Sequence, residues 1–501
     1  MQYDSIFLSY RYLFDLLIVT FTRTTSTMMR ILIYVTLLLC VTACAKDDDD
    51  TTQTADNILE LVVDRDYSLL LYNGTASPAA ELLVVGTDTL QFAEDVTTLE
   101  VGKSYPVEYL GEDYVLHKTA LPIVSISTVE AIDPDTKVDG NISLIDAGAL
   151  KSFELGIEYR GGFSLTFDKK SYTLELRDAD GSSNKKPLLD LRDDDDWILD
   201  ALYNEPLRVR DYVAHELWLS FGRVSDPGLD PISKGSRRVY CEVFENGSYR
   251  GVYYLGERID RKQLDLAAPD ADGLQGELYK GVNWDRGTTW QAEDNYDDTS
   301  ESWSGWELKY PEVEDNEFSW KNMYDLLQLV TDAEDAEFAE RIGTYIDIDN
   351  IIDYYLLINM LQAEDNVGKN IYIARSSSDG RYYFLPWDLD GVMGRNWRGD
   401  KTDSPVDKIV TNPLFDRLLA VPAVVSRIQD RWNTLKDDQL SANAIEGMIR
   451  DYYGELKQSN VYEREDIRDD LSFRYSEEEL IYLSDWLQQR YAVVENHVSS
   501  L

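Results

Sequence analysis

Cysteine and histidine are scarce in this chain of 501 residues, which holds only three of each. The histidines, His117, His215 and His497, lie far apart in the sequence. They suggest neither a His-rich metal site nor, with any obvious nucleophile, a catalytic triad. Three cysteines are also too few for a framework of disulfide bonds. Any general base in this protein is therefore expected to be a carboxylate.

Positive charge is also in short supply. The chain has 48 Lys and Arg residues against 93 Asp and Glu residues, which gives a formal net charge of −45 at pH 7. A field of that sign repels nucleic acids and anionic membrane surfaces, so neither is an expected partner. Hydrophobic residues make up 44% of the chain and aromatic residues 12%, which is enough for a large core. The length allows more than one domain.

Residues 1–44 resemble a lipoprotein signal peptide. An apolar run at residues 31–40 follows Met28, Met29 and Arg30, and the small residues before Cys44 resemble a lipobox. We expect translation to start at Met28 or Met29, and Cys44 to become the lipidated first residue of the mature protein. The alternative is a secretory cleavage site with an incidental cysteine.

An acidic linker is expected at residues 45–57. Its run of four aspartates, residues 47–50, resembles the export tag of surface lipoproteins in Bacteroidota, although such runs are also common in solvated linkers. The resemblance implies a protein that is lipid-anchored to the outer membrane and exposed at the cell surface. A membrane contact would then be made through the lipid on Cys44.

Two regions follow the linker. Short apolar runs separated by Gly, Asp, Pro and Ser predict a small all-β domain at residues 58–118, in which no chemistry is visible. A longer region at residues 119–498 begins with strand patterns and ends with amphipathic helices. The predicted fold class is therefore α+β.

The stretch at residues 361–391 carries the strongest chemical signal. Apolar and aromatic runs at residues 370–375 and 381–387 flank a turn of Ser, Asp and Gly, which predicts a β-hairpin. If Arg375 faces Arg381, then Asn370 lies opposite Pro386.

This pairing would bring four oxygen-bearing side chains together. Asp365 and Asn370 precede the first strand, and Asp388 and Asp390 follow the second. Carboxylates at close range repel one another and raise one another's pKa unless a cation lies between them. A hard metal ion such as Mg²⁺ is the expected occupant.

Basic residues suited to an anion occur earlier in the chain. Lys169 and Lys170 follow Arg160 and two glycines, a composition that can hold phosphate, although a plain hairpin with a basic turn fits as well. Arg210 lies on the inner face of a predicted helix at residues 207–221. It requires an anion there, which is either a phosphate group or the partner of a structural ion pair.

Five ordered segments resemble one known family. They are WILDALYNEPLRVRDYVAHELW, VYCEVFENGSYRGVYYLGERID, LYKG, EDNVGKNIYIAR and YYFLPWDLDG. Together they resemble the spore-coat protein H (CotH) kinase family of atypical protein kinases, over residues 121–440. The resemblance implies a kinase-like fold with a β-rich N-lobe and a helical C-lobe. It also implies binding of ATP and Mg²⁺, and phosphorylation of protein hydroxyl groups.

Site residues follow from this resemblance. Asp365 resembles the catalytic aspartate, Asn370 and Asp388 resemble metal ligands, and Asp390 follows directly. Four cations are candidates for contact with the nucleotide phosphates, and Glu257 is a candidate ion-pair partner that orients one of the lysines. These cations are Lys169, Lys170, Arg210 and Lys280. The chain has Glu205 and Leu207 where the family typically has Asp and Ser.

Two other functions remain open at this stage. One is a non-catalytic surface adhesin or scaffold built on a kinase-like fold. The other, which places less weight on the family, takes Asp388-Leu-Asp390 as the D-x-D metal motif of a glycosyltransferase.

Overall fold

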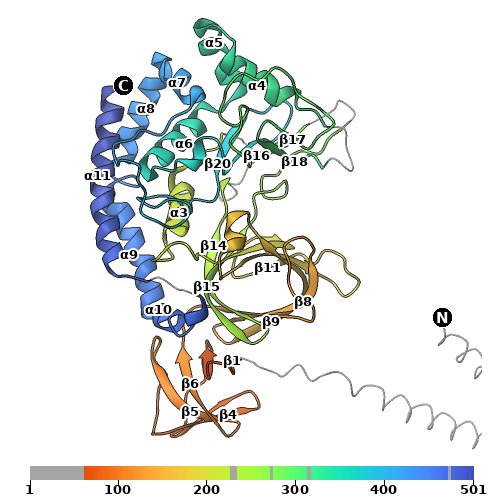
Figure 1. The fold of residues 1–501 in the computed structure, drawn as a ribbon, viewed down its shortest axis with the longest axis vertical. Helices are drawn as coiled ribbons and strands as arrows, with labels where there is room; N and C mark the ends of the chain where they lie inside the picture. Colours follow the sequence, from red (N-terminus) through yellow and green to blue (C-terminus); the bar gives the residue numbers. More distant parts are fainter. Residues whose placement is uncertain (1–60, 226–233, 271–274, 313–317, 472–474) are drawn as a thin grey trace, which may run out of the picture. The chain divides into compact units, whose positions relative to one another are not determined.

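The computed structural model describes residues 61–225, 234–270, 275–312, 318–471 and 475–501. The expected signal peptide, with Cys44, and the acidic linker lie outside the described residues. Residues 59–501 form one compact unit of mixed α and β structure, as the sequence predicts (Figure 1). Within the described ranges, no helix has both the length and the apolar character needed to span a membrane.

The first six strands form a sheet of their own. Its strand order is β1-β2-β6-β5-β4-β3, in which β2 and β6 run parallel. Residues alternate between buried and exposed along β3 and β4, which shows that one face of the sheet packs on a core. The strands are β1 (Leu61–Asp64), β2 (Leu69–Tyr72), β3 (Leu82–Val85), β4 (Asp88–Phe92), β5 (Ser104–Tyr109) and β6 (Glu112–Lys118).

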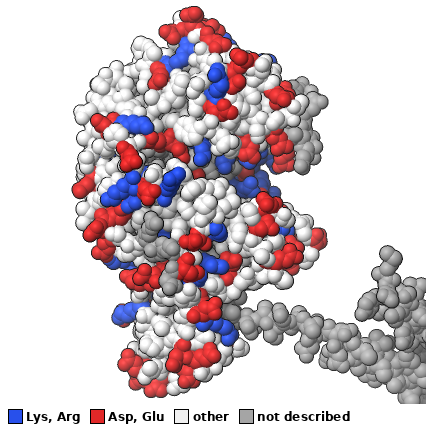
Figure 2. Space-filling view, viewed as in Figure 1, with Lys and Arg blue, Asp and Glu red and all other residues white. Residues whose placement is uncertain are grey.

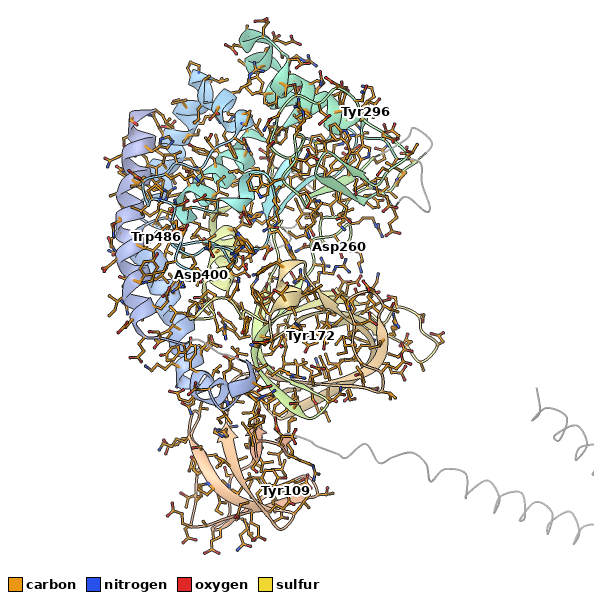
Figure 3. All side chains as sticks on the ribbon, viewed as in Figure 1. Tyr109, Tyr172, Asp260, Tyr296, Asp400 and Trp486 are labelled. Atoms are coloured by element: carbon orange, nitrogen blue, oxygen red, sulfur yellow. The ribbon has the colours of Figure 1, made fainter. Side chains whose placement is uncertain are left out.

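Seven later strands close into a barrel in the order β10-β13-β15-β14-β7-β8-β9. Its interior is filled with apolar side chains, including Trp197 and the labelled Tyr172 (Figure 3). The strands are β7 (Ile123–Thr128), β8 (Val138–Asp146), β9 (Ala149–Arg160), β10 (Ser171–Arg177), β13 (Asp196–Asp200), β14 (Arg238–Glu245) and β15 (Ser248–Glu257). The short strands β11 (Lys186–Pro187) and β12 (Asp193–Asp194) pair beside it.

A second open sheet contains the predicted hairpin. Its order is β17-β18-β16-β19-β20, and β19 and β20 are the two hairpin strands. The predicted register is wrong by one residue, because Ile371 pairs with Pro386 and Asn370 lies opposite Trp387. The strands are β16 (Glu277–Gly281), β17 (Ser302–Trp303), β18 (Trp306–Tyr310), β19 (Ile371–Arg375) and β20 (Tyr383–Pro386).

Helices pack against this sheet and against one another. The central helix α6 (Ile348–Leu361) is buried along nearly its whole length and contacts β20, α8 and α11. Its N-cap is Asp347, whose side chain accepts from the backbone N–H groups of Asp349 and Asn350. The others are α3 (Arg210–Phe221), α4 (Lys321–Thr331), α5 (Asp335–Tyr345), α7 (Pro413–Leu419), α8 (Pro422–Leu435), α9 (Ala442–Gln458), α10 (Val461–Glu465) and α11 (Glu478–Ser500).

Candidate functional site

A cavity of about 570 Å³ lies where the barrel, the second sheet and the loop after α6 meet. Charged and amide side chains supply much of its wall. On the face drawn in Figure 2, acidic side chains are widespread, and some basic side chains gather beside a hollow. The charged and amide residues that line the cavity are Arg160, Lys169, Asp200, Asn204, Glu205, Asp211, Lys280, Asn283, Asp365, Lys369, Asn370, Asp388 and Asp390.

The loop after α6 places Asp365 at this cavity. Helix α6 ends at Leu361, and its C-cap Gln362 adopts the left-handed conformation. The short 3-10 helix η3 (Asp365–Val367) follows. Asn366 is 2% exposed, and its amide donates to the carbonyl oxygens of Asn370 at 2.7 Å and Trp387 at 2.9 Å. Asn366 therefore fastens the loop to the end of the hairpin, a positioning role that the sequence analysis missed.

Asn370 and Asp388 flank the hairpin with unusual backbone conformations. Each has a φ of 54°, in the left-handed region that Asn and Asp tolerate better than most residues. Between them, the N–H of Trp387 donates to the carbonyl oxygen of Asn370 at 3.1 Å. The hairpin thus brings Asn370, Asp388 and Asp390 to one cavity, together with Asp365.

The carboxylates of the cavity are electrostatically unfavourable as a group. The Asp388 side chain is open to solvent, but the surrounding walls desolvate it and, with Asp211 and Asp200, raise its pKa to about 6. Burial and then the charge of Asp388 raise the pKa of Asp390 well above its ordinary value. Burial also raises the pKa of Asp365.

These carboxylates form no ion pair within the described ranges, although the charges of Arg160 and Lys280 act to lower the pKa of Asp388. Asp390 accepts a hydrogen bond from the amide of Asn204 at 2.6 Å. Among the described residues, no Lys or Arg forms an ion pair with Asp388 or Asp390. Carboxylates with raised pKa values and no ion pair among the described residues have the chemistry that a divalent cation requires.

Lys280 supplies an uncommitted positive charge to the cavity. It lies on β16, with its ammonium group 5.6 Å from the ring centre of Tyr372 and 5.9 Å from that of Trp387. Burial lowers its pKa, and the structure gives it no ion pair within the described ranges. Lys369 also lines the cavity, although the sequence analysis did not select it. Both lysines are available to an anionic ligand.

Lys169 lies on the cavity wall but has a buried partner. Its Nζ lies 2.8 Å from Oε1 of Glu465 on α10, and both side chains are almost fully buried. Burial lowers the pKa of Lys169 to about 8, while the charge of Glu465 acts in the opposite direction. The expected partner, Glu257, is therefore replaced by Glu465, for which the sequence held no local signal.

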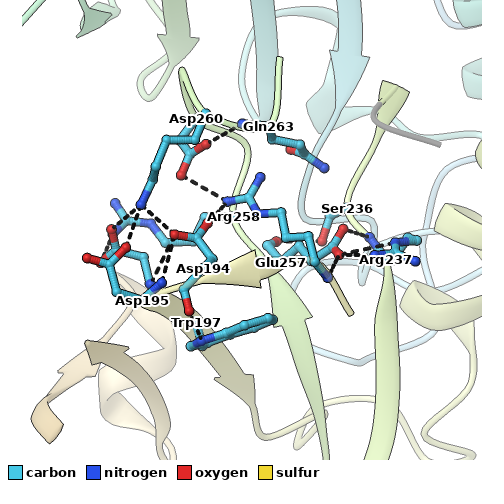
Figure 4. Close-up of polar contacts among 12 residues, drawn as sticks. Asp194, Asp195, Trp197, Ser236, Arg237, Glu257, Arg258, Asp260 and Gln263 are labelled. Carbon is cyan, nitrogen blue, oxygen red and sulfur yellow. Dashed lines mark hydrogen bonds and ion pairs between the residues drawn. The ribbon is translucent and has the colours of Figure 1, made fainter. Parts of the chain in front are cut away.

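Three predicted residues do not line the cavity. Glu257 is 2% exposed and pairs with Arg237, with 2.7 Å between Oε1 and a guanidinium nitrogen (Figure 4). The strand pairing explains this contact. Arg238 on β14 lies opposite Gly256 on β15, so Arg237 lies beside Glu257. Lys170 donates to the backbone carbonyl oxygens of Leu165 and Phe167 instead of reaching the cavity.

Arg210 is the third of these residues. It is 0% exposed and binds Glu205, and one of its guanidinium nitrogens lies 2.6 Å from Oε1 of Glu479. Of the two roles considered for Arg210, the structure therefore shows the structural ion pair and no contact with the cavity. Glu205 also accepts from the backbone N–H groups of Leu207 and Val209, so it holds the start of α3.

A different acidic cluster lies away from the cavity. Asp194, Asp196 and Asp260 have carboxylate oxygens within 4.8 Å of one another (Figure 4). Lys262 contacts Asp194 and Asp196, and Arg192 pairs with Asp194 and Asp260. Because protein cations already neutralise this cluster, it is a structural network.

The chain matches one protein family and one curated relative. Residues 157–494 match the family described as CotH kinase protein, and this range includes every residue that lines the cavity. The chain is 21% identical over 315 residues to the inner spore coat protein H of Bacillus subtilis, a match that covers 63% of this chain and 77% of that protein.

A comparison with solved structures finds further matches. The crystal structure of the Helicobacter pylori proinflammatory kinase CtkA has 11% sequence identity to this chain and a TM-score of 0.27. The match covers 66% of this chain and 94% of that one.

Proposed function

The chain belongs to the CotH kinase protein family, and we propose that it transfers the γ-phosphate of ATP to protein hydroxyl groups with Mg²⁺ as cofactor. In this proposal the barrel is the N-lobe and the helical part is the C-lobe of a kinase-like arrangement. The observation that carries it is the cavity of about 570 Å³, whose lining brings Lys169, Lys280 and Lys369 together with Asp365, Asn370, Asp388 and Asp390. That volume lies within the usual range of small-molecule sites, about 300–1,000 Å³.

Asn370 and Asp388, with Asp390 beside them, would hold Mg²⁺. Their fit to a hard cation rests on their oxygen ligands and on the raised pKa values of the two aspartates. When bound, the ion would neutralise the charge that develops on the phosphate oxygens. Asn204 orients Asp390 through its hydrogen bond of 2.6 Å.

Lys280, Lys369 and Lys169 would bind the phosphates. Lys280 and Lys369 offer their ammonium groups directly, whereas Lys169 is held in place by Glu465. Local positive charge is essential on a chain with a net charge of −45, because the overall field repels ATP.

Asp365 would accept the proton of the attacking hydroxyl and orient its oxygen. Phosphoryl transfer needs little more from a protein than positioning and stabilisation of charge. The raised pKa of Asp365 strengthens it as a base. Its position on η3, fastened by Asn366, fixes the direction from which the hydroxyl approaches.

A transfer assay with labelled ATP and Mg²⁺ tests this function. We expect label to appear on the protein itself or on an added acceptor protein, and to disappear in Asp365→Ala and Asp388→Ala with folding retained. Asp196→Asn, which alters the neutralised acidic cluster, is the matched control and keeps activity. Absence of transfer together with no effect of nucleotide on the melting temperature would favour a scaffold. Stabilisation by a nucleotide sugar and not by ATP would favour glycosyl transfer.

Lipid attachment at Cys44 is a separate part of the proposal. It is supported by the apolar run and lipobox-like residues that precede Cys44, and by the acidic run that follows. The protein would then be anchored to the outer membrane and exposed at the cell surface. Metabolic labelling with a fatty acid should label the wild-type protein, and Cys44→Ala should abolish that label. Labelling that persists in the variant would rule this anchor out.

A further inference from the structure

A second cavity, of about 230 Å³, meets the first at the proposed catalytic aspartate. Both are lined by Asp365, Asp388, Asp390 and Trp397. The lysines that would bind phosphate line only the larger cavity, so a donor nucleotide belongs there. An acceptor hydroxyl in the smaller cavity would lie next to the proposed base, because Asp365 lines both cavities.

Thr402 is the only hydroxyl-bearing residue among the described residues that line the smaller cavity. A tight hairpin holds it there. Arg395 forms a β-bridge with Lys401, and the N–H of Thr402 donates to the carbonyl oxygen of Gly394 at 2.9 Å. Within it, the N–H of Asn396 donates to the carbonyl oxygen of Asp400, the residue labelled in Figure 3, at 2.9 Å. The position of Thr402 is thus fixed by the backbone.

The hydrogen bonding of Thr402 leaves its proton available. Its Oγ accepts from the N–H of Ser404 at 3.1 Å. A hydroxyl group can also donate one hydrogen bond, and within the described part of the chain no acceptor takes the proton of Thr402. The proton can therefore be given to a base in the same cavity, and Asp365 lines that cavity.

We infer that Thr402 is an internal phosphate acceptor, modified by its own active site. The inference rests on the proposed kinase function and names a substrate for it. Oγ of Thr402 attacks the γ-phosphorus of ATP, and the bond from that phosphorus to the bridging oxygen breaks. ADP leaves with the bond's electron pair, and the hydroxyl proton passes to Asp365. The products are phosphothreonine at position 402 and ADP.

Peptide mapping by mass spectrometry after incubation with Mg²⁺ and ATP tests this inference. We expect one phosphate on Thr402, appearing at a rate per molecule that does not change over a tenfold range of protein concentration. Thr402→Val, of nearly the same shape, should lose this phosphate, and Thr402→Ser should keep it. Ser404→Ala is the matched control in the same segment and should still be modified at Thr402. Melting temperatures identify any variant that fails to fold. The position of the phosphate in the wild-type protein is mapped directly and does not depend on any variant.

Two results would overturn the inference in different ways. Phosphate found only at other residues, or a rate at Thr402 that rises with protein concentration, would refute modification within one molecule. The proposed kinase function would survive that result. No phosphate on the chain or on any added acceptor, and no release of ADP, would refute the proposed function as well.

Discussion

Lys169 and Glu465 form a buried ion pair across 296 positions of the sequence, with 2.8 Å between Nζ and Oε1. The same carboxylate lies 3.4 Å from Nε of Arg208 and accepts from the N–H of Val252. Through Glu465, helix α10 near the C-terminal end of the chain is joined to the barrel wall of the candidate site. The pair therefore connects the stability of the protein to the position of a proposed phosphate-binding lysine.

Replacement of Glu465 by Ala should strongly destabilise the protein. The two cations would remain buried without their common anion, and loss of one partner from a buried pair costs about 3–5 kcal/mol. Denaturant unfolding of the purified protein measures the change. The double variant Lys169→Met/Glu465→Gln removes both charges of the pair and should recover part of the loss. A single variant as stable as the wild type would contradict the buried pair.

Mg²⁺ and ATP together should raise the melting temperature of the wild-type protein. A ligand present at 100 times its Kd stabilises the folded state by about 2.7 kcal/mol. Asp388→Asn should lose the part of the shift that depends on Mg²⁺, because a proposed metal ligand is weakened. Asp196→Asn, in the neutralised cluster, should keep the full shift. The idea fails if Asp388→Asn responds to Mg²⁺ and ATP as the wild type does.

Asp365→Asn should separate binding from transfer. The variant keeps the shape of the side chain but removes the base, a change that lowers rates about 10²–10⁴-fold in general base catalysis. Nucleotide binding, measured by calorimetry with Mg²⁺ and ATP, should remain within a few-fold of the wild type. Transfer at the wild-type rate would exclude Asp365 as the base.

The sequence predicted the hairpin of the site but not its register. Turn residues separate two apolar runs, which is a clear local pattern. Register is fixed when polar and apolar residues alternate, but β20 is buried throughout and β19 is buried at all but its last residue. Without alternation, the sequence alone could not show that Ile371, and not Asn370, faces Pro386.

Residues that depend on distant partners were harder to predict. Glu257 was selected as a partner of a lysine, but in the folded structure it pairs with Arg237. Glu465 lies in a charged segment near the C-terminal end and carries no motif, so only the folded structure could reveal its contact with Lys169. Local patterns therefore selected side chains that line the cavity, including Asp365, Asp388 and Lys280, whereas the ion-pair partners of Lys169 and Glu257 required tertiary structure.

Arg210→Met should affect folding more than nucleotide binding. Arg210 is fully buried between Glu205 and Glu479 and does not line the cavity. The substitution removes a cationic partner from two buried carboxylates. We therefore expect the free energy of unfolding to fall by about 3–5 kcal/mol. The protein that remains folded should still show the wild-type shift with Mg²⁺ and ATP. A selective loss of nucleotide binding at unchanged stability would instead restore the phosphate-contact hypothesis.

Stability should fall as the pH is lowered from about 6.5 towards 4, in part because of His117. Burial lowers the pKa of His117 from 6.5 to about 4, and the charge of Arg464 adds to this effect. In that window the unfolded chain binds a proton that the folded chain does not, so acid favours unfolding, by up to about 1.4 kcal/mol per pH unit. Above pH 6.5 the neutral form predominates in both states and this contribution is constant. His117→Gln should reduce the pH slope of the unfolding free energy between pH 5 and 6.5, and an unchanged slope would show that His117 does not titrate in this way.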